Sequence, residues 1–427
     1  MTKLAIIGGN PVLNVPLTPY CSIGQEEIDA VNRVARSGRL SSFIGAWCED
    51  FNGGTEIKGL EQEWSERFGC KHAISVNSNT SGLIAALGAV GISPGDEVIV
   101  PPYSMSATVM APLIYGGIPV FVDIESDTFC LDPVLVRAAI TPKTRAILAV
   151  DLFGHPAALI ELRSLADEHG IYLIEDAAQA PLASESNRLA GTIGHIGVFS
   201  LNYHKHIHTG EGGICCTDDD TLALRLRMIR NHGENVVEPL HIEDITNIIG
   251  YNFRMTELSA AIGREQLRKI DVLVTEREAI AQRLSTELAG LQGLTIPLVR
   301  PECRHVYYVW CARHDAKATG VMRSTVVRAL AAEGVPLSEG YLRPLYMLPA
   351  FQKRMAIGRD GWPFTLTDRR YEKGLCPVAE RVEENELIEF GTCSFQLSKS
   401  ELDLVIQAFH KVYSQLDVLA DLERKAT

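Results

Sequence analysis

Short, uninterrupted apolar runs alternate with longer amphipathic stretches through the first half of the chain. The apolar runs predict strands at 72–76, 97–101, 119–124, 146–152, 171–175, 198–201 and 213–217. The stretches between them predict helices at 83–90, 106–115, 133–139, 160–169 and 222–230. Strands that are apolar throughout are buried on both faces. The pattern therefore predicts the α/β class, with a mainly parallel sheet covered by helices on both sides.

The segments before the first strand carry weaker signals. Residues 1–25 are broken by glycine and proline and predict an irregular arm. Helical spacing predicts helices over 25–36 and 56–68. The segment 37–54 is rich in glycine and serine and also carries aromatic residues, which fits either a surface loop or a loop on the substrate side.

The second half of the chain indicates a smaller domain. After an irregular segment at 232–251, a helix opens at 252–257 and continues through 270 to 291 as the expected spine between domains. Beyond it, strands such as 306–310 mix with helices at 324–333 and 400–416. We expect three parts, namely an arm (1–25), a large domain (26–273) and a small C-terminal α/β domain (274–427).

Composition and charge exclude several classes of protein. The 427 residues are 46% hydrophobic and 22% charged, which is typical of a globular protein. The net charge of −13, with no basic run, disfavours nucleic acid as a partner. The uncharged stretch 98–122 contains four prolines and two glycines, so we interpret it as two strands around a helix and expect no membrane span. Ten cysteines without a CxxC pair predict free thiols in a reducing cytoplasm and no metal site.

Two residues at strand ends suggest the chemistry. The strand at 171–175 leads into Asp176, and Lys205 lies between the end of the next strand and a Gly-Glu-Gly-Gly turn. A lysine amine can condense with the aldehyde of pyridoxal 5'-phosphate (PLP). A carboxylate can keep the proton on the pyridine nitrogen, so that the ring accepts electrons. The pair predicts a PLP site at the carboxyl ends of the strands.

A possible phosphate site lies between the first predicted strand and its helix. The connection is Asn77-Ser78-Asn79-Thr80-Ser81-Gly82, made of small amide and hydroxyl residues. Free N–H groups and the dipole at a helix N-terminus favour an anion there. The alternative is that Ser78 or Thr80 simply caps the helix.

Several segments carry a resemblance to a known family. They are 94–101, 141–144, Glu175-Asp176-Ala177-Ala178-Gln179, Lys205 with its Gly210-Glu211-Gly212-Gly213 turn, and 251–257. In these the chain resembles the DegT/DnrJ/StrS sugar aminotransferases, which are PLP enzymes with the aspartate-aminotransferase fold (fold type I). The resemblance implies a large PLP-binding domain followed by a smaller C-terminal domain.

The resemblance also implies a role for each matching residue. Lys205 would hold the cofactor and then move the proton between the substrate carbon and the cofactor. Asp176 would pair with the pyridine nitrogen, and Gln179 would contact the hydroxyl side of the ring. The phosphate would be held by Ser200, Asn79 and Thr80. Asn252 would reach the phosphate of a neighbouring subunit, which implies a homodimer with shared active sites; a helix N-cap is the alternative for Asn252.

Two departures from the family pattern bear on cofactor and substrate. Met105 takes the place where the family commonly stacks an aromatic residue on the cofactor ring. Tyr346 stands where members acting on nucleotide-linked sugars often have histidine, which favours a cyclitol substrate such as scyllo-inosose. The segment 374–380 is related to that of members that aminate scyllo-inosose. His204, next to Lys205, either contacts substrate hydroxyls or makes a structural hydrogen bond.

The sequence thus predicts a PLP-dependent aminotransferase with a ping-pong cycle. Glutamate or glutamine would donate the amino group, and either a nucleotide-linked keto-hexose or a keto cyclitol would accept it. Such a reaction belongs to amino-sugar, polysaccharide or antibiotic biosynthesis. The alternatives are a PLP-dependent sugar dehydratase, in which histidine replaces the lysine, and a PLP-binding regulator without turnover.

Overall fold

A computed structural model describes residues 2–426, and its centre is a seven-stranded sheet in the order β1-β9-β8-β5-β4-β2-β3. The strands are β1 (His72–Val76), β2 (Glu97–Val100), β3 (Ile118–Phe121), β4 (Thr144–Val150), β5 (Tyr172–Asp176), β8 (Ile196–Ser200) and β9 (Gly213–Thr217). Neighbouring strands are parallel except at β9, which runs antiparallel to both β1 and β8. The predicted α/β class and mainly parallel sheet are confirmed.

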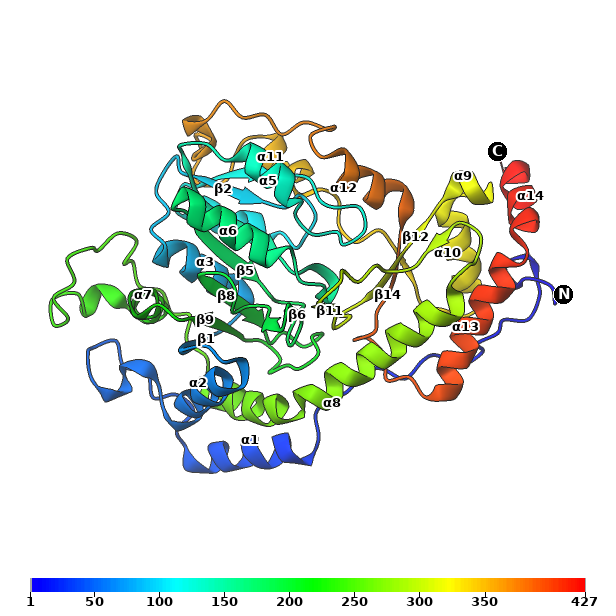
Figure 1. Ribbon diagram of the computed structural model, residues 1–427. Coiled ribbons are helices and arrows are strands. Elements are labelled where there is room, and N and C mark those ends of the chain that lie inside the picture. The colour runs from blue at the N-terminus through cyan, green and yellow to red at the C-terminus, as the bar shows by residue number, and fades with distance from the viewer. Residues whose placement is uncertain (1, 427) are drawn as a thin grey trace.

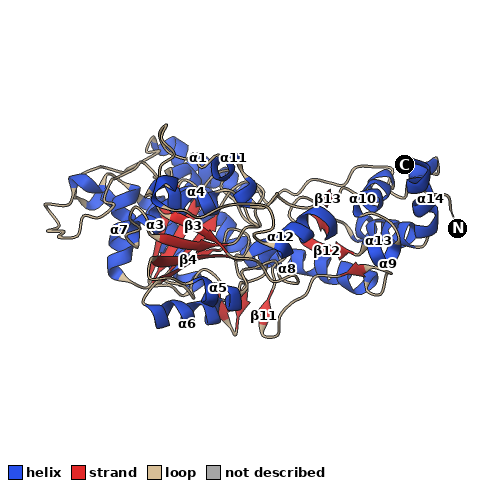
Figure 2. Cartoon of the chain, turned by 90° about the horizontal axis from the view of Figure 1, so that it is seen from above, coloured by secondary structure: helices blue, strands red, loops and turns tan. Residues whose placement is uncertain are grey.

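Helices cover both faces of this sheet, as the view from above shows (Figure 2). On one side lie α3 (Asn79–Ala89), α4 (Ala107–Ile114) and α7 (Asp220–Arg230). On the other lie α5 (Pro133–Ala139) and α6 (Leu159–His169). Helix α3 is apolar around its circumference because it also packs between α4 and α7. This layering explains why the central strands lack in–out alternation.

A single long helix, α8 (Glu257–Leu288), links the two ends of the molecule (Figure 1). Its Val274 belongs to the hydrophobic core of the large sheet, whereas Ile280 belongs to a second core at the other end. The expected spine is therefore present. It begins at Glu257 and not at Asn252, because the hydroxyl of Thr256 accepts a hydrogen bond from the backbone N–H of Ser259 and caps the helix.

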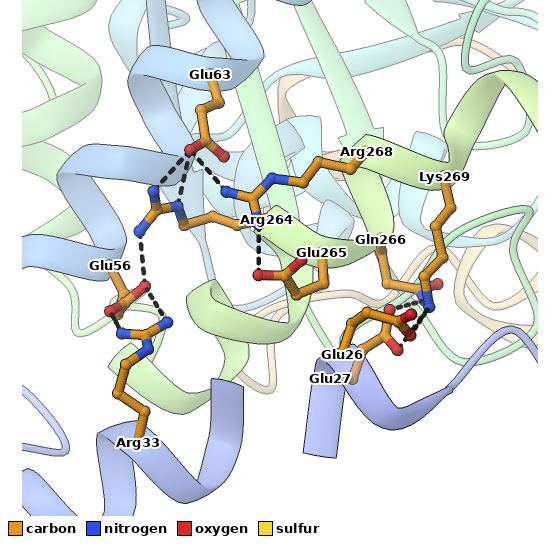
Figure 3. Close-up of polar contacts among 10 residues, drawn as sticks. All are labelled: Glu26, Glu27, Arg33, Glu56, Glu63, Arg264, Glu265, Gln266, Arg268 and Lys269. Atoms are coloured by element: carbon orange, nitrogen blue, oxygen red, sulfur yellow. Dashed lines mark hydrogen bonds and ion pairs between the residues drawn. The ribbon is translucent and has the colours of Figure 1, made fainter. Parts of the chain in front are cut away.

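Charged side chains attach two earlier helices to α8 (Figure 3). Helix α1 (Gln25–Ser37) and helix α2 (Thr55–Phe68) both pack against it. The Glu56 carboxylate pairs with Arg33 and lies 2.8 Å from an Arg264 guanidinium nitrogen, so it joins all three helices. Lys269 of α8 lies 2.8 Å from a carboxylate oxygen of Glu27 of α1.

The second core carries an antiparallel sheet in the order β10-β12-β14-β13. Its strands are β10 (Leu294–Thr295), β12 (Trp310–His314), β13 (Ser338–Glu339) and β14 (Leu387–Phe390). Its helices are α9 (Ala316–Thr319), α10 (Arg323–Ala332), α13 (Lys399–Tyr413) and α14 (Leu416–Ala426). The remaining strands and α-helices are β6 (Ser184–Glu185), β7 (Arg188–Leu189), β11 (Cys303–Arg304), α11 (Pro349–Gln352) and α12 (Pro377–Arg381).

Two sequence predictions for this part differ from the structure. The strand predicted at 306–310 begins only at Trp310, because the backbone of Val306 donates to the carbonyl of Gly154 and Tyr307 adopts a φ of +49°. The apolar residues there are buried by packing and not by a strand ladder. The helix predicted at 400–416 ends at Tyr413, and α14 follows it as a separate helix.

The two ends of the chain do not pack as their sequence positions suggest. Leu4, Leu13 and Leu17 of the arm join the second core, whereas Leu345 and Phe351 of the C-terminal part join the core of the large sheet. The domain boundaries at 25 and 273 stay a prediction. None of the helices within residues 2–426 combines the length and apolar character needed to cross a bilayer.

Candidate active site

Asp176 is the last residue of β5, and its carboxylate is held from three directions. One oxygen accepts hydrogen bonds from the Asn79 amide nitrogen at 2.9 Å and from the backbone N–H of Ala178 at 3.2 Å. The other oxygen accepts from the Thr108 hydroxyl at 3.4 Å. Burial raises the pKa of Asp176 to about 6, against the hydrogen bonds and the charge of Lys205, which lower it. A positively charged group nearby therefore stabilises the ionised form of Asp176.

The preceding residue, Glu175, points to the opposite side of the strand and has a different task. Its carboxylate accepts backbone N–H groups from Gly191 at 2.6 Å and Ile193 at 2.7 Å, and also from Gly194. Burial raises its pKa to about 7, although these three hydrogen bonds oppose the shift. Glu175 therefore holds the 191–194 turn, and only the second acid of the pair faces the site.

Lys205 lies in the loop that follows β8, and only 7% of the residue is exposed. Its backbone N–H donates to the carbonyl of Asn202 at 3.0 Å. Its side-chain nitrogen lies 4.3 Å from the centroid of the Tyr308 ring and has no hydrogen-bond or ion-pair partner among residues 2–426. Burial lowers the pKa of Lys205 to about 8, although Asp176 opposes the shift. A lysine of this kind is neutral for an appreciable part of the time near pH 8.

The N-terminus of α3 offers two backbone donors next to this pair. Ser78 caps the helix by accepting the N–H of Ser81 at 3.1 Å, which leaves the N–H groups of Asn79 and Thr80 without a partner in the described chain. Gly213 of β9 passes so close that a Cβ there would lie 2.9 Å from the Asn79 nitrogen. The cap and the anion site proposed from the sequence are therefore compatible, because they use different groups.

The neighbouring strand ends complete this corner. Ser200 pairs with Gly213 in the β8–β9 ladder, and its hydroxyl accepts the N–H of Asn202 at 3.3 Å. The side-chain oxygen of Asn79 is buried and has no partner in the described chain. A buried oxygen without a donor and two free N–H groups are groups that a bound ligand would satisfy.

These residues fit PLP, because each functional group of the cofactor finds a complementary group. The amine of Lys205 suits its aldehyde, the carboxylate of Asp176 suits a protonated pyridine nitrogen, and the α3 N-terminus suits its phosphate. The carboxyl ends of parallel strands bring the three together, where α/β proteins bind their ligands. Fold and site together define a PLP-dependent enzyme of fold type I.

Comparison with known proteins gives the family. The profile of the DegT/DnrJ/EryC1/StrS aminotransferase family matches residues 22–387, and the chain belongs to this family. The L-glutamine:2-deoxy-scyllo-inosose aminotransferase of Streptoalloteichus tenebrarius is 34% identical over 428 residues, which cover 96% of this chain and 97% of that protein. The dTDP-3-amino-3,4,6-trideoxy-alpha-D-glucose transaminase of Streptomyces venezuelae is 36% identical over 333 residues, with coverages of 78% and 82%.

The solved structures agree with this assignment. The crystal structure of S. venezuelae DesV in complex with a ketimine intermediate matches with a TM-score of 0.79 at 31% identity, covering 94% of this chain and all of that one. The predicted family, fold and cofactor are confirmed, and the protein is a PLP-dependent aminotransferase.

Gln179 lies at the edge of the site and is fixed at both ends. Its side-chain oxygen accepts the backbone N–H of Phe153 at 2.6 Å, and its nitrogen donates to the Tyr341 hydroxyl at 3.2 Å. Phe153 has a φ of +60°, a region that a bulky residue seldom adopts. In this strained conformation the backbone N–H of Phe153 points toward the side-chain oxygen of Gln179. Tyr341 therefore brings a hydroxyl from the C-terminal part of the chain to the cofactor side of the sheet.

Sequence reasoning missed three groups that the structure brings here, namely Thr108, Tyr308 and Tyr341. Thr108 stands only three residues beyond Met105, so the family segment around Met105 could have pointed to it. Tyr308 and Tyr341 come from separate segments without a motif. Only the packing of those segments onto the large sheet reveals them.

Three of the predicted cofactor residues lie partly at the surface. Thr80 and Asn252 are exposed, and the side chain of Met105 is 55% exposed. Asn252 accepts a hydrogen bond from Arg254 at 2.7 Å, and its backbone forms a bridge with Asn231. The N-cap alternative for Asn252 is wrong, because α8 is capped four residues later by Thr256.

The two predicted substrate residues differ in accessibility. His204 is exposed directly before Lys205 in the same loop, and its ring centroid lies 6.0 Å from that of Tyr308. Tyr346 is fully buried, and its hydroxyl donates to the Glu380 carboxylate. Its ring also packs edge-on against Phe121. Packing and this hydrogen bond account for Tyr346 without a substrate.

The histidine that follows Lys205 has a structural role. The ring nitrogen Nε2 of His206 lies 2.9 Å from the Val306 carbonyl, and its own carbonyl accepts the Tyr20 hydroxyl at 2.8 Å. Burial lowers the pKa of His206 to about 3, so the ring is neutral and Nε2 donates. The arm and the 305–308 segment thus hold the loop that carries Lys205.

Proposed function

We propose that the protein transfers an amino group from glutamate or glutamine to a keto sugar or a keto cyclitol. When bound, PLP supplies a conjugated ring that accepts the electron pair of the carbon being deprotonated. Lys205 would attach to the cofactor and, once released, would carry the proton to and from that carbon. The observation that supports this role most directly is the burial of Lys205, which lowers its pKa to about 8 and keeps part of the amine neutral.

The remaining cofactor contacts follow from the positions of the side chains. Asp176 would keep the proton on the ring nitrogen, with Asn79 and Thr108 holding its carboxylate in place. The N–H groups of Asn79 and Thr80, with the Ser200 hydroxyl, would hold the phosphate. Gln179 would lie on the hydroxyl side of the ring.

The relatives make two kinds of acceptor credible. One is named for a 2-deoxy-scyllo-inosose substrate with L-glutamine as donor, and the other for a dTDP-linked amino sugar. The first match extends over 96% of this chain, so we favour a keto cyclitol with glutamine as donor. His204 is a candidate contact for substrate hydroxyls because it is exposed next to Lys205. Tyr346 is fully buried, so its side chain is not a contact of the proposed substrate.

A homodimer with shared active sites is part of the proposal. Met105 and Asn252, which the family places at the cofactor, are exposed in the single chain, and a second copy would cover them. Asn252 would then act on the phosphate in the neighbouring subunit.

All ten cysteines are free, several of them buried, which supports a reducing compartment such as the cytoplasm.

The dehydratase alternative is less well supported. It requires histidine at the position that Lys205 occupies, and the adjacent His204 and His206 do not replace the amine. A binding protein without turnover would not need a buried lysine with a lowered pKa beside a carboxylate.

The test is the visible absorption spectrum of the purified protein with PLP, before and after glutamine or glutamate is added. We expect a yellow band that bleaches with one of the two donors and returns when the right ketone is supplied. A band that no amino acid bleaches would favour the dehydratase or the binding protein. The absence of any band after PLP addition would refute the assignment of the site.

A further inference from the structure

Glu383 makes an unusual connection between the two ends of the molecule. It lies in a π-helix, Val382–Glu386, a rare form that often marks functional positions. One of its carboxylate oxygens accepts the Tyr103 hydroxyl at 2.7 Å and the backbone N–H of Tyr341 at 2.8 Å. A single oxygen thus joins a segment of the large sheet to a segment of the C-terminal part.

Each of the two partners leads to the cofactor site. Tyr103 is fully buried and begins the segment that carries Met105 and, one turn later, Thr108, whose hydroxyl faces Asp176. Tyr341 presents its own hydroxyl to Gln179 at 3.2 Å. The Glu383 carboxylate is therefore connected to Gln179 through Tyr341, and to Thr108 through the segment that begins at Tyr103.

The rings of the two partners enclose a third. Tyr103, Phe153 and Tyr341 pack edge to face, with ring centroids 5.2 to 6.4 Å apart and interplanar angles of 82°. Phe153 is the residue whose strained backbone donates to Gln179. If Tyr341 moved, this cluster and the hydrogen bonds of Gln179 would move with it.

The chain next to Tyr341 is shaped for the carboxylate. Gly340 has a φ of +68°, and a Cβ there would lie 2.6 Å from both Glu383 carboxylate oxygens. A residue with a side chain would therefore meet strain and a collision with Glu383 at this position.

We propose that Glu383 is a positioning residue of the aminotransferase, because its carboxylate holds Tyr341 against Gln179 at the proposed cofactor site. The proposal rests on the proposed function. A carboxylate makes stronger hydrogen bonds than a neutral acceptor, and here one oxygen serves two donors. Its loss would leave the buried Tyr103 hydroxyl and the Tyr341 N–H without their acceptor. Small displacements of positioning groups can lower a rate by about 10²-fold.

The variants are chosen to separate positioning from general stability. Glu383→Ala removes the acceptor, whereas Glu383→Gln keeps one acceptor oxygen and should restore most of the function. Glu384→Ala is the matched control, because Glu384 is exposed in the same π-helix and pairs with Lys373 at 2.5 Å. Should Glu383→Ala fail to fold, Tyr103→Phe removes one of the two hydrogen bonds and keeps the ring.

The first measurement is hydrogen exchange of residues 338–344 in the protein without PLP. The second is the PLP dissociation constant, and the third is the bleaching rate with the amino donor at saturating PLP. For Glu383→Ala we expect exchange and the dissociation constant to rise, and the bleaching rate to fall, each by about tenfold or more. Glu383→Gln and Glu384→Ala should stay within about threefold of the unchanged protein.

Two results would overturn the proposal. One is unchanged exchange and bleaching in Glu383→Ala, and the other is an equal loss in Glu384→Ala. If the unchanged protein binds PLP but no donor bleaches it, the proposed function fails. Exchange and PLP affinity still decide the role of Glu383 in that case.

Discussion

The side-chain nitrogen of Lys205 lies 4.3 Å from the ring centroid of Tyr308, so the amine from the large domain faces an aromatic ring from the C-terminal part. The ring shields the amine from water, and burial is the largest cause of the lowered pKa of Lys205. An aromatic face also attracts the protonated amine, which opposes the shift. Because burial dominates, a residue more than a hundred positions away along the chain helps to keep the pKa of Lys205 low.

Opening this ring contact should raise the pKa of Lys205. In Tyr308→Ala water reaches the amine, and we expect its pKa to rise from about 8 by about one unit toward the ordinary value of 10.5. Tyr308→Phe keeps the ring and should leave the pKa in place. The measurement is the pH dependence of the rate at which an amine-reactive reagent labels Lys205 in the protein without PLP. A lower pKa in Tyr308→Ala would mean that ring attraction outweighs shielding.

Replacing Lys205 should stop the reaction. Lys205→Ala removes the group that moves the proton, so single-turnover amine transfer should fall by at least about 10²- to 10⁴-fold. Added methylamine should restore part of the rate, because it supplies a free amine in the vacated space. Lys373→Ala, a surface lysine paired with Glu384, is the control and should react normally. A Lys205→Ala protein that transaminates at nearly the original rate would refute the assignment.

Asp176 should make the protein without PLP less stable as the pH rises. Its pKa is about 6 in the folded chain and 3.8 in the unfolded one, so the folded state binds the proton more tightly. Protonated Asp176 therefore contributes about 3 kcal/mol to the free energy of unfolding below pH 4, and this contribution is lost as the pH rises to about 6. Asp176→Asn should flatten this dependence in urea unfolding between pH 4 and 7. An equally steep dependence in the variant would assign it to other groups, such as Glu175.

Mixed dimers test whether Asn252 acts across the subunit interface. Asn252→Ala should weaken PLP retention, and Lys205→Ala should be inactive. A mixed dimer of these two variants has one site with both residues intact if Asn252 serves the neighbouring subunit, so one of its two sites should retain PLP and react as in the unchanged protein. If Asn252 serves its own subunit, every site that keeps Lys205 lacks Asn252, and the mixed dimer should retain PLP as weakly as Asn252→Ala. Amine transfer at limiting PLP, measured on the isolated mixed dimer, distinguishes the two cases.

The ion pairs at α8 should contribute unequally to stability. Arg264 is 22% exposed and contacts Glu56, whose side chain is 7% exposed, so Arg264→Ala leaves a buried carboxylate with fewer partners. We expect a loss of about 2 to 3 kcal/mol in the free energy of unfolding. Arg268 is 53% exposed, and Arg268→Ala should cost less than about 1 kcal/mol. Urea unfolding at neutral pH measures both, and equal losses would contradict the role of burial.

The parts predicted from sequence are those encoded within one segment. The apolar run of β5 ends in Asp176 and that of β8 leads to Lys205, so the strand pattern and the ligand-binding edge were enough to place both. The bond between Asn79 and Asp176 could not be predicted, because it depends on how two strands that are not neighbours along the chain align at one edge. The same holds for Tyr308 and Tyr341, which reach the site through packing.

Local strain also escaped prediction, because it contradicts the propensity of the residue. Phe153 and Tyr307 have positive φ values, and no pattern marks an aromatic residue for that conformation. These two positions are where the loops after β4 and before β12 cross, beside Gly154. The misplaced strand at 306–310 has the same origin, since apolar character predicted a ladder where the backbone bends.

The hydrogen bond from Tyr20 to the carbonyl of His206 gives the arm a role that its position at the start of the chain does not suggest. Through this bond the arm holds the loop that carries Lys205. A shortened protein beginning at α1 would keep every residue assigned to cofactor binding and would still lose this brace. For engineering, Tyr20 and the residues around it are therefore best kept together with the loop that carries Lys205.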